Sequence, residues 1–355
     1  MNIYGLIMAG GGGTRFWPLS RKKKPKQMLN LDGKDTMINK TIDRVAKALP
    51  GENIFIVTNK DQARDMESIV MDKVEISHIL KEPAARNTAA CIGYGAMEIV
   101  KKYGDGMMCI FPADHFIKDE HSFAKTVMEG IEQATREDGL VTIGIKPTFP
   151  STGYGYIRYK KEKEEGLAYR VEQFVEKPER ELAKEYVESG CYLWNSGMFI
   201  WKASVILDYF KELLPKVYTC LLKIGEAMGT EREWEVIEEI YPSIPKISID
   251  YGIMERADKV FVLEGDFGWS DVGSWEALDT LYEPDENNNI IHGDFICIDT
   301  NHCISYSSGK LIAAIGLEDI VIVETKDAVL VCKKDRTQDV KEVVEALKKD
   351  REDLL

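Results

Sequence analysis

A run of four glycines, Gly10 to Gly13, opens a segment whose charged residues are all basic. The six basic residues are Arg15, Arg21, Lys22, Lys23, Lys24 and Lys26. Glycines let backbone N–H groups turn inward and approach a ligand closely, and nearby cations supply the counter-charge. Because the chain of 355 residues has a net charge of −14, this segment is a local exception. It predicts a cradle for the phosphates of a small anionic ligand.

Two common phosphate-binding motifs do not fit this glycine run. It lacks the Gly-Lys-Ser/Thr ending of the P-loop and the third glycine of the dinucleotide fingerprint. The observed order is an apolar stretch from Ile3 to Met8, the glycines, Arg15, a Pro-Leu pair and Pro25-Lys26. This order resembles the signature of the sugar-phosphate nucleotidylyltransferases, G-G-x-G-x-R-L-x-P-L followed by P-K.

Two aspartates stand where a metal ion could be held. Asp114 follows an apolar stretch in FPADHF, and Asp271 lies in the small-residue turn GWSDVG. A carboxylate at the carboxyl end of a strand suits a hard cation such as Mg²⁺. Read alone, Asp114 is more often a helix cap and Asp271 an ordinary turn residue. The resemblance implies that both hold one Mg²⁺ ion.

The stretch EPAARNTAA, residues 82–90, stands between an expected strand and an expected helix. Asn87 suits an N-cap, and the N–H groups of the turn can equally meet a purine edge. The stretch resembles the guanosine-selecting loop of the mannose-1-phosphate guanylyltransferases. The resemblance implies these nucleotide-binding residues: Gly10, Gly11, Gly12, Gly13, Thr14, Arg15, Glu82, Pro83, Asn87, Thr88, Pro112 and Asp114.

Two further short motifs suit a sugar phosphate. Glu176 can accept hydrogen bonds from hydroxyls, Lys177 can pair with a phosphate, and the amide of Asn195 can both donate and accept. The resemblance runs from Ile3 to Trp275 and implies these sugar-phosphate-binding residues: Gly155, Glu176, Lys177, Asn195, Gly197 and Asp250.

The expected reaction needs charge neutralisation more than proton transfer. A sugar 1-phosphate is largely ionised at neutral pH and attacks without a general base. A catalytic histidine is therefore not needed, and His115 is interpreted as structural. Catalysis must neutralise charge around the α-phosphorus, with Arg15 on the triphosphate and Lys26 at the α-phosphate. The predicted catalytic residues are Arg15, Lys26, Asp114 and Asp271.

Short apolar stretches alternate with helical patterns over the first half of the chain. The expected strands are residues 3–8, 53–58, 74–80, 107–111 and 141–145, with helices near 38–49 and 88–103. This alternation predicts an α/β fold, a Rossmann-like and mostly parallel sheet with helices on both faces. Ligands bind at the carboxyl ends of such strands, so the loops after Met8, Leu80 and Phe111 should share one cleft.

After residue 153 the sequence no longer alternates between buried strands and helices. Alternating runs at 154–159 and 169–175 predict a hairpin, with the charged stretch 160–166 as a solvated tip. A linker-like PDENNN separates an expected catalytic domain, 1–282, from a small β-rich domain, 288–355, ended by a helix near 338–349. Its short strands permit a left-handed β-helix. It lacks a His-rich metal pattern, so isomerase activity is not expected.

Bulk properties narrow the class of protein. The pI near 5.0 and the single basic segment argue against nucleic acid as a partner. No apolar run is long enough to cross a membrane and no basic leader is present, so we expect a cytoplasmic protein with reduced cysteines and no membrane partner. Self-association into a homodimer is a further expectation.

The sequence favours transfer of GMP from GTP to mannose 1-phosphate, giving GDP-mannose and pyrophosphate with Mg²⁺. One alternative is the same chemistry with another base or another sugar 1-phosphate. A second alternative is a non-catalytic regulatory member of the same fold. That alternative predicts that residues which bind phosphate or metal have been replaced. Here Arg15, Lys26, Asp114 and Asp271 are all present.

Overall fold

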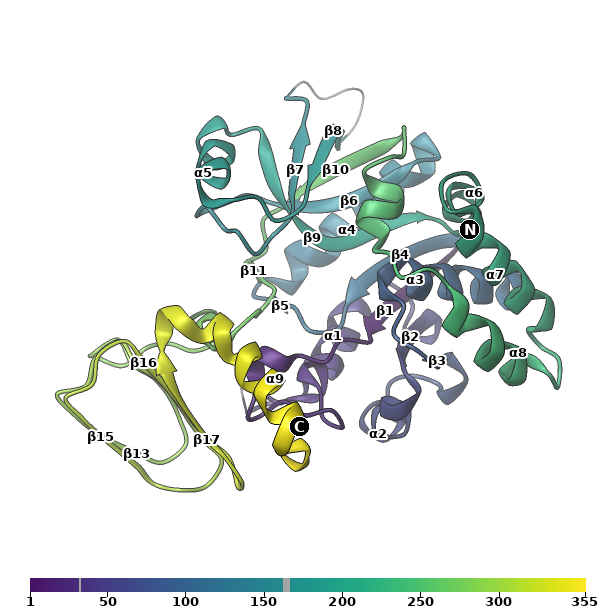
Figure 1. Cartoon of the computed structure of the whole chain (residues 1–355). Helices are drawn as coiled ribbons and strands as arrows, with labels where there is room; N and C mark the ends of the chain where they lie inside the picture. The colour runs from purple at the N-terminus through teal and green to yellow at the C-terminus, as the bar shows by residue number, and fades with distance from the viewer. Residues whose placement is uncertain (32, 162–166) are drawn as a thin grey trace. The chain divides into compact units, whose positions relative to one another are not determined.

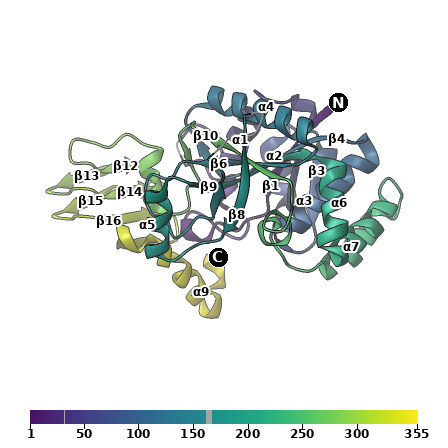
Figure 2. The ribbon, with the colours of Figure 1, turned by 90° about the horizontal axis from the view of Figure 1, so that it is seen from above.

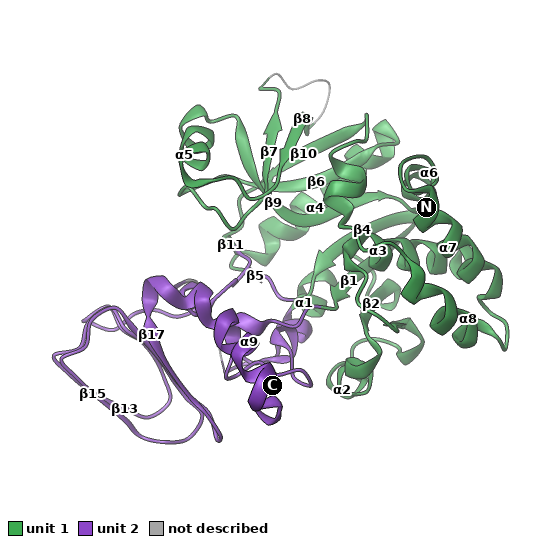
Figure 3. Ribbon diagram, viewed as in Figure 1, with its two compact units in different colours: residues 1–10, 41–113, 117–269 green, residues 11–40, 114–116, 270–355 purple. Residues whose placement is uncertain are grey.

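The computed structural model describes residues 1–31, 33–161 and 167–355. The chain forms two compact units, shown in separate colours in Figure 3. Unit 1 comprises Met1–Gly10, Thr41–Ala113 and Ile117–Trp269, and unit 2 comprises Gly11–Lys40, Asp114–Phe116 and Ser270–Leu355. The glycine-rich segment thus belongs to the same unit as the C-terminal residues. The domain boundary between residues 282 and 288 stays a prediction.

Within the described residues, unit 1 is built on a nine-stranded sheet, visible in Figure 1. The strand order is β3 (Ile79–Glu82), β2 (Ile54–Asn59), β1 (Asn2–Ala9), β4 (Gly106–Pro112), β9 (Tyr192–Lys202), β6 (Leu140–Ile145), β10 (Val260–Gly265), β8 (Tyr169–Val175) and β7 (Tyr156–Tyr159). Strands β3, β2, β1 and β4 are parallel, as are β6 and β10. Strand β9 runs antiparallel to β4, β6 and β7, so the sheet is parallel only in these two parts.

Helices cover both faces of this sheet, as Figure 2 shows from above. On one face α3 (Asn87–Glu98) and α6 (Ala203–Leu213) contact the strands, and α7 (Pro215–Ala227) and α8 (Glu233–Ile240) pack in succession on them. On the other face α4 (Glu120–Glu137) lies against β4, β6, β9 and β10. Strands β2, β4 and β6 are buried on both faces, which agrees with their almost continuously apolar sequences. Strands β7 and β8 at the end of the sheet are only partly buried.

Most of the remaining elements are short. The helices are α1 (Met37–Val45), α2 (Lys60–Val70), α5 (Arg180–Ser189), η1 (Thr14–Phe16), η2 (Lys26–Met28), η3 (Gly51–Asn53), η4 (Ile76–His78), η5 (Ile99–Tyr103), η6 (Tyr241–Ser243), η7 (Asp250–Met254), η8 (Trp275–Thr280), η9 (Lys334–Asp339) and η10 (Glu352–Leu354). Two short strands are β5 (Phe116–Ile117) and β11 (Trp269–Ser270). Among the described residues, no helix has the length and apolar character that a membrane crossing requires.

Unit 2 carries a coil of short strands followed by a helix. Strands β12 (Ile290–His292), β14 (Ile304–Ser307) and β16 (Ile320–Glu324) pair in parallel, as do β13 (Phe295–Ile298) and β15 (Ile312–Ile315). Strand β17 (Val329–Lys333) returns antiparallel to β16, and α9 (Val340–Asp350) follows η9. Stacked parallel strands joined by turns are the geometry of a β-helix, in agreement with the sequence expectation.

The α/β fold class with a small β-rich C-terminal part is confirmed, and two details differ from expectation. The expected strand 74–80 begins only at Ile79, because η4 precedes it and Ile76 is 60% exposed. The expected helix 88–103 changes to a π-helical turn at Ile99. The predicted hairpin forms from β7 and β8, whereas part of its expected charged tip, residues 162–166, lies outside the described residues.

Candidate active site

The glycine run places its last member against Lys26. The segment leaves β1 at Ala9, and added Cβ atoms at Gly11 and Gly12 would meet no atom closer than 4.0 Å. Gly13 has φ +57, and a Cβ there would lie 2.4 Å from the Cβ of Lys26. Only glycine fits this left-handed and crowded position. The run therefore leaves open space beside exposed backbone and holds Lys26 in place.

Lys26 lies at the centre of the site. Its side chain is 5% exposed, and its ammonium group donates to Asp114 Oδ2 at 2.9 Å and to the carbonyl oxygen of Asp271 at 2.6 Å. The ammonium also stands 5.7 Å from the centre of the Phe16 ring. A buried lysine keeps its charge only when such partners replace water. These contacts fix one cation at a defined point.

Asp114 follows β4 directly and is ionised at neutral pH. Burial works to raise the pKa of its carboxyl, but the charges of Lys26 and His115 and the hydrogen bond from Lys26 outweigh it. The net effect lowers the pKa of Asp114 below its ordinary value. The side chain is still 35% exposed, so an ionised carboxylate oxygen faces the solvent side of the site.

Asp271 is held in a tight and strained turn. The next residue, Val272, has φ +46, which is rare for a β-branched side chain, and it is fully buried in the core of unit 2. A Cβ at Gly273 would lie 2.9 Å from Asp271 Oδ2, so a larger residue there would have to displace the Asp271 carboxylate. Backbone strain of this kind costs about 1 to 3 kcal/mol and occurs preferentially at functional sites.

These groups line one pocket of about 360 Å³ that belongs entirely to unit 2. Its lining residues are Gly13, Thr14, Arg15, Phe16, Lys26, Asp114, His115, Asp271, Gly273 and Lys341. The four predicted catalytic residues, Arg15, Lys26, Asp114 and Asp271, are therefore brought together. Their roles stay predictions.

Only two of the six basic residues of the sequence segment line this pocket. Arg21 pairs with Asp327 at 2.6 Å and also donates to the carbonyl oxygen of Leu354. Lys22 pairs with Glu352 at 2.6 Å. Fewer cations therefore surround the ligand pocket than the sequence predicted, because Arg21 and Lys22 form ion pairs with residues near the C-terminus.

The donor set fits a magnesium ion that is completed by substrate. Among the described residues, no group of three or more His, Cys, Asp or Glu side chains gathers as a metal site. Magnesium is usually bound by one or two carboxylates together with waters and substrate phosphates. Asp114 and Asp271 line the same pocket and supply such a pair of oxygen-donor side chains.

The predicted nucleotide residues of unit 1 gather at one edge of its sheet. Glu82 ends β3, Pro112 ends β4, and a Cβ at Gly10 would lie 3.0 Å from Glu82 Oε2. Burial raises the pKa of the Glu82 carboxyl to about 7, although a hydrogen bond from the Tyr241 hydroxyl lowers it. Parallel strands place their carboxyl ends together, as the sequence predicted for these strands.

Asn87 and Thr88 shape the turn into α3, together with Pro83, which follows β3. Asn87 has φ +67, is exposed, and accepts a hydrogen bond from the backbone N–H of Thr88 at 2.8 Å. The N-cap position itself is Arg86, so Asn87 does not cap the helix in the expected way. Thr88 Oγ1 accepts from the backbone N–H of Ile249 at 2.9 Å, which ties this turn to the start of η7.

The predicted sugar-phosphate residues also lie together, within unit 1. Asn195 Nδ2 donates to Asp250 Oδ1 at 2.7 Å, and its backbone N–H donates to Gly155 O at 2.8 Å. A Cβ at Gly155 would lie 2.9 Å from Glu176 Oε2, an oxygen that is buried without a hydrogen-bond partner among the described residues. Burial raises the pKa of both Glu176 and Asp250, and the charge of Asp250 raises the pKa of Glu176 further.

Two more predicted positions complete this group. Gly197 has φ +70, and its N–H donates to Asn195 Oδ1 at 3.1 Å. Lys177 has φ +43, and its side chain is 63% exposed beside Glu176. A buried oxygen without a partner next to an exposed lysine suits a ligand that carries both hydroxyl and phosphate groups.

Sequence reasoning missed four residues that the structure adds to these sites. Phe16, Gly273 and Lys341 line the pocket of unit 2, and Tyr241 contacts Glu82. Phe16 and Gly273 lie within the motifs noted above, so their position in the sequence could have identified them as residues of the site. Nothing in the sequence distinguishes Lys341 or Tyr241, because both come from distant helices.

Comparison with known proteins identifies the family to which the chain belongs. The nucleotidyl transferase family matches residues 4–288, and a MannoseP isomerase/GMP-like β-helix domain matches residues 293–347. The chain therefore belongs to the nucleotidyl transferase family, whose members that act on sugar phosphates generally use a divalent metal.

Its relatives are similar over almost the whole chain. A mannose-1-phosphate guanylyltransferase of Salmonella montevideo is 39% identical over 97% of this chain and 73% of the relative. The alginate biosynthesis protein AlgA of Pseudomonas putida is 40% identical over 96% and 71%. A crystal structure from Thermus thermophilus, named as a mannose-1-phosphate geranyltransferase, has a TM-score of 0.88 and 36% identity, covering 98% of this chain and 100% of that one.

Proposed function

We propose that this protein transfers the GMP group of GTP to mannose 1-phosphate, giving GDP-mannose and pyrophosphate. The observation that carries the proposal is Lys26, an almost buried cation bound by Asp114 and Asp271 in the pocket beside the glycine run. The similarity to a named mannose-1-phosphate guanylyltransferase over 97% of the chain supports the choice of substrates.

Each group of residues takes a role that its charge allows. Lys26 neutralises the charge that grows at the α-phosphate, and Arg15 with the backbone of Gly11 to Gly13 binds the triphosphate. Glu176 and Asp250 accept hydrogen bonds from the sugar hydroxyls, and the amide of Asn195 both donates and accepts. Lys177 pairs with the sugar phosphate. The attacking phosphate oxygen is already ionised, so no residue has to remove a proton.

Asp114 and Asp271 would hold Mg²⁺, which would draw charge away from the triphosphate when bound. The ionised state of Asp114, with its lowered pKa, is the state that binds a cation. We propose Mg²⁺ as the metal that this protein uses.

Base selection is assigned to the turn between β3 and α3. Asn87 is exposed there with a left-handed backbone, in the stretch that follows Glu82 and Pro83. A backbone turn and an amide side chain can both donate to and accept from the edge of a guanine. The hydrogen bond from the backbone N–H of Ile249 to Thr88 Oγ1 keeps the turn in one conformation.

A pyrophosphate-release assay tests the proposal. The purified protein with Mg²⁺ is given each of four nucleoside triphosphates with mannose 1-phosphate, glucose 1-phosphate or galactose 1-phosphate. We expect release with GTP and mannose 1-phosphate well above every other pair. Preference for another base or sugar would reassign the substrates, and no release with any pair would favour the non-catalytic alternative. A homodimer and a cytoplasmic location stay predictions.

A further inference from the structure

The pocket beside the glycine run has one wall from the C-terminal helix. Lys341, on the first turn of α9, lines it together with Arg15 and Lys26. Helix α9, labelled in Figure 1, contacts η1. Val340 and Val344 lie on one face of α9 and are buried in the same core as Phe16 and Trp17. The position of Lys341 is therefore fixed by packing on both sides of it.

The charges in this pocket suit an anion. Arg15, Lys26 and Lys341 supply three basic side chains, beside His115, whereas Asp114 and Asp271 supply two carboxylates. Lys26 is already bound to Asp114 and to the carbonyl oxygen of Asp271. Within residues 1–31, 33–161 and 167–355, neither Arg15 nor Lys341 forms an ion pair. Like charges around one cavity repel each other unless a ligand of opposite charge separates them.

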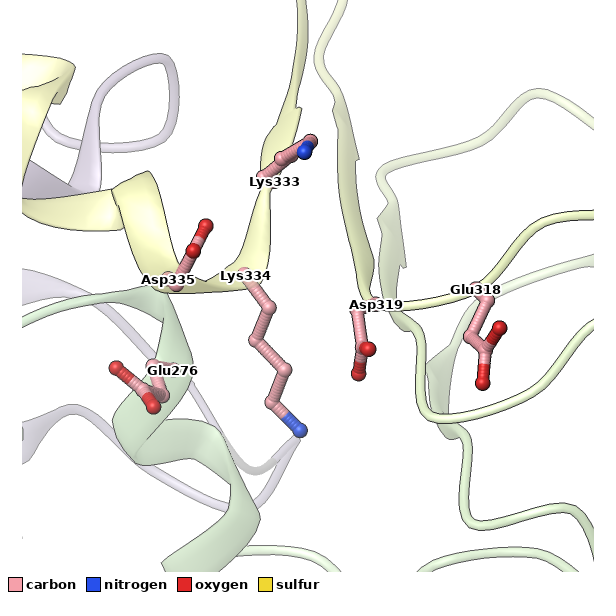
Figure 4. Close-up of a pocket in the computed structure, with 6 residues that line it drawn as sticks. All are labelled: Glu276, Glu318, Asp319, Lys333, Lys334 and Asp335. Carbon is pink, nitrogen blue, oxygen red and sulfur yellow. The ribbon is translucent and has the colours of Figure 1, made fainter.

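A second pocket of unit 2 shows that this charge pattern is not general. Figure 4 shows that pocket, of about 420 Å³, which has more acidic than basic side chains around it. Its lining residues are Glu276, Glu318, Asp319, Lys333, Lys334 and Asp335. Lys334 there pairs with Asp279 at 2.9 Å. Such a cavity would repel a polyphosphate, in contrast to the pocket that Lys341 lines.

We propose that Lys341 binds the β- and γ-phosphates of the nucleoside triphosphate, the part that leaves as pyrophosphate. This inference rests on the proposed function. Lys26 is tied to the two aspartates where the α-phosphate reacts, which leaves Arg15 and Lys341 for the outer phosphates. A lysine on an anchored helix gives a compact charge on a flexible stem that can follow a departing anion. The C-terminal helix thereby supplies a substrate-binding residue.

Kinetics in both directions test this role. In the reverse reaction, pyrophosphate and GDP-mannose are separate substrates with separate KM values. Lys341→Ala should raise the KM for pyrophosphate about tenfold, the usual effect of losing one charge-assisted contact, and leave the KM for GDP-mannose unchanged. Lys341→Arg should recover most of the pyrophosphate affinity. Lys349→Ala, on the same helix but outside the pocket, is the matched control and should match the wild type.

Binding measurements give an independent readout. Lys341→Ala should weaken GTP binding by a similar factor and leave GMP binding unchanged, because GMP lacks the outer phosphates. Unchanged KM for pyrophosphate in Lys341→Ala, or equal losses for pyrophosphate and GDP-mannose, would overturn the inference. Failure of the proposed function would appear differently, as a wild-type protein that does not join GTP and mannose 1-phosphate.

Discussion

Lys26 illustrates how one side chain can serve both the folded structure and the reaction. Its ammonium compensates Asp114 and binds the backbone of Asp271, so it stands at the point where the two metal-binding candidates meet. Loss of one donor that stabilises transition-state charge costs about 2.7 to 4 kcal/mol in the barrier. We therefore expect Lys26→Ala to lower kcat on the order of a hundredfold or more, measured by pyrophosphate release. Lys24→Ala, an exposed neighbour outside the pocket, is the control, and near-wild-type turnover in Lys26→Ala would refute the role.

Glu82 makes stability depend on pH. Burial raises the pKa of its carboxyl from 4.5 to about 7 in the folded protein, so between these values the folded chain holds a proton that the unfolded chain has lost. Below pH 4.5 this carboxyl contributes its full amount to the free energy of unfolding. As the pH rises through 7, the free energy of unfolding falls by about 3 kcal/mol because the folded protein must then bury the charged carboxylate. Glu82→Gln should flatten this dependence in urea unfolding between pH 4.5 and 7.5. An identical pH slope in both proteins would show that Glu82 is not the group responsible.

At the scale of elements, the glycine run and η2 depend on each other. Gly13 has φ +57 and no room for a Cβ, because Lys26 lies 2.4 Å from the point where it would stand. Gly13→Ala should displace Lys26, lower turnover at least tenfold and destabilise the protein by about 1 kcal/mol or more. Gly51→Ala is the control, since its added methyl group meets no atom within 4 Å. Equal activity of the two variants would mean that Lys26 does not depend on this contact.

The sequence predicted well those elements whose pattern lies within a few consecutive residues. Continuous apolar runs identified β1, β2, β4 and β6, and the motif residues Arg15 and Lys26 proved to line one pocket with Asp114 and Asp271. The late start of β3 was missed because Val74 and Ile76 continue the apolar pattern while the chain is still outside the sheet. The antiparallel course of β9 was also not predictable, since strand direction depends on distant connections.

At the scale of the whole molecule, sequence reasoning failed where contacts join distant residues. The basic segment looked like a set of phosphate ligands, yet Arg21 and Lys22 bind Asp327 and Glu352, more than three hundred residues later. Lys341 carries no motif and reaches the pocket only because α9 packs on η1. Charge and composition identify a kind of ligand, whereas tertiary packing decides which of several similar cations meets it.

The same packing makes the C-terminal coil a support for the pocket. Ile304 in β14 is fully buried in one core with Phe16 and Leu29, which flank the pocket residues Arg15 and Lys26. Ile304→Ala should cost about 2 to 5 kcal/mol of stability, seen as a lower Tm by calorimetry, and turnover should fall at the temperature where this core unfolds. Val331→Ala, at a side chain that is 63% exposed, should change Tm little. Added GTP should restore part of the lost stability, because a ligand that binds only the folded core shifts the unfolding equilibrium. Full turnover above the temperature at which the core has melted would show that the pocket does not need this support.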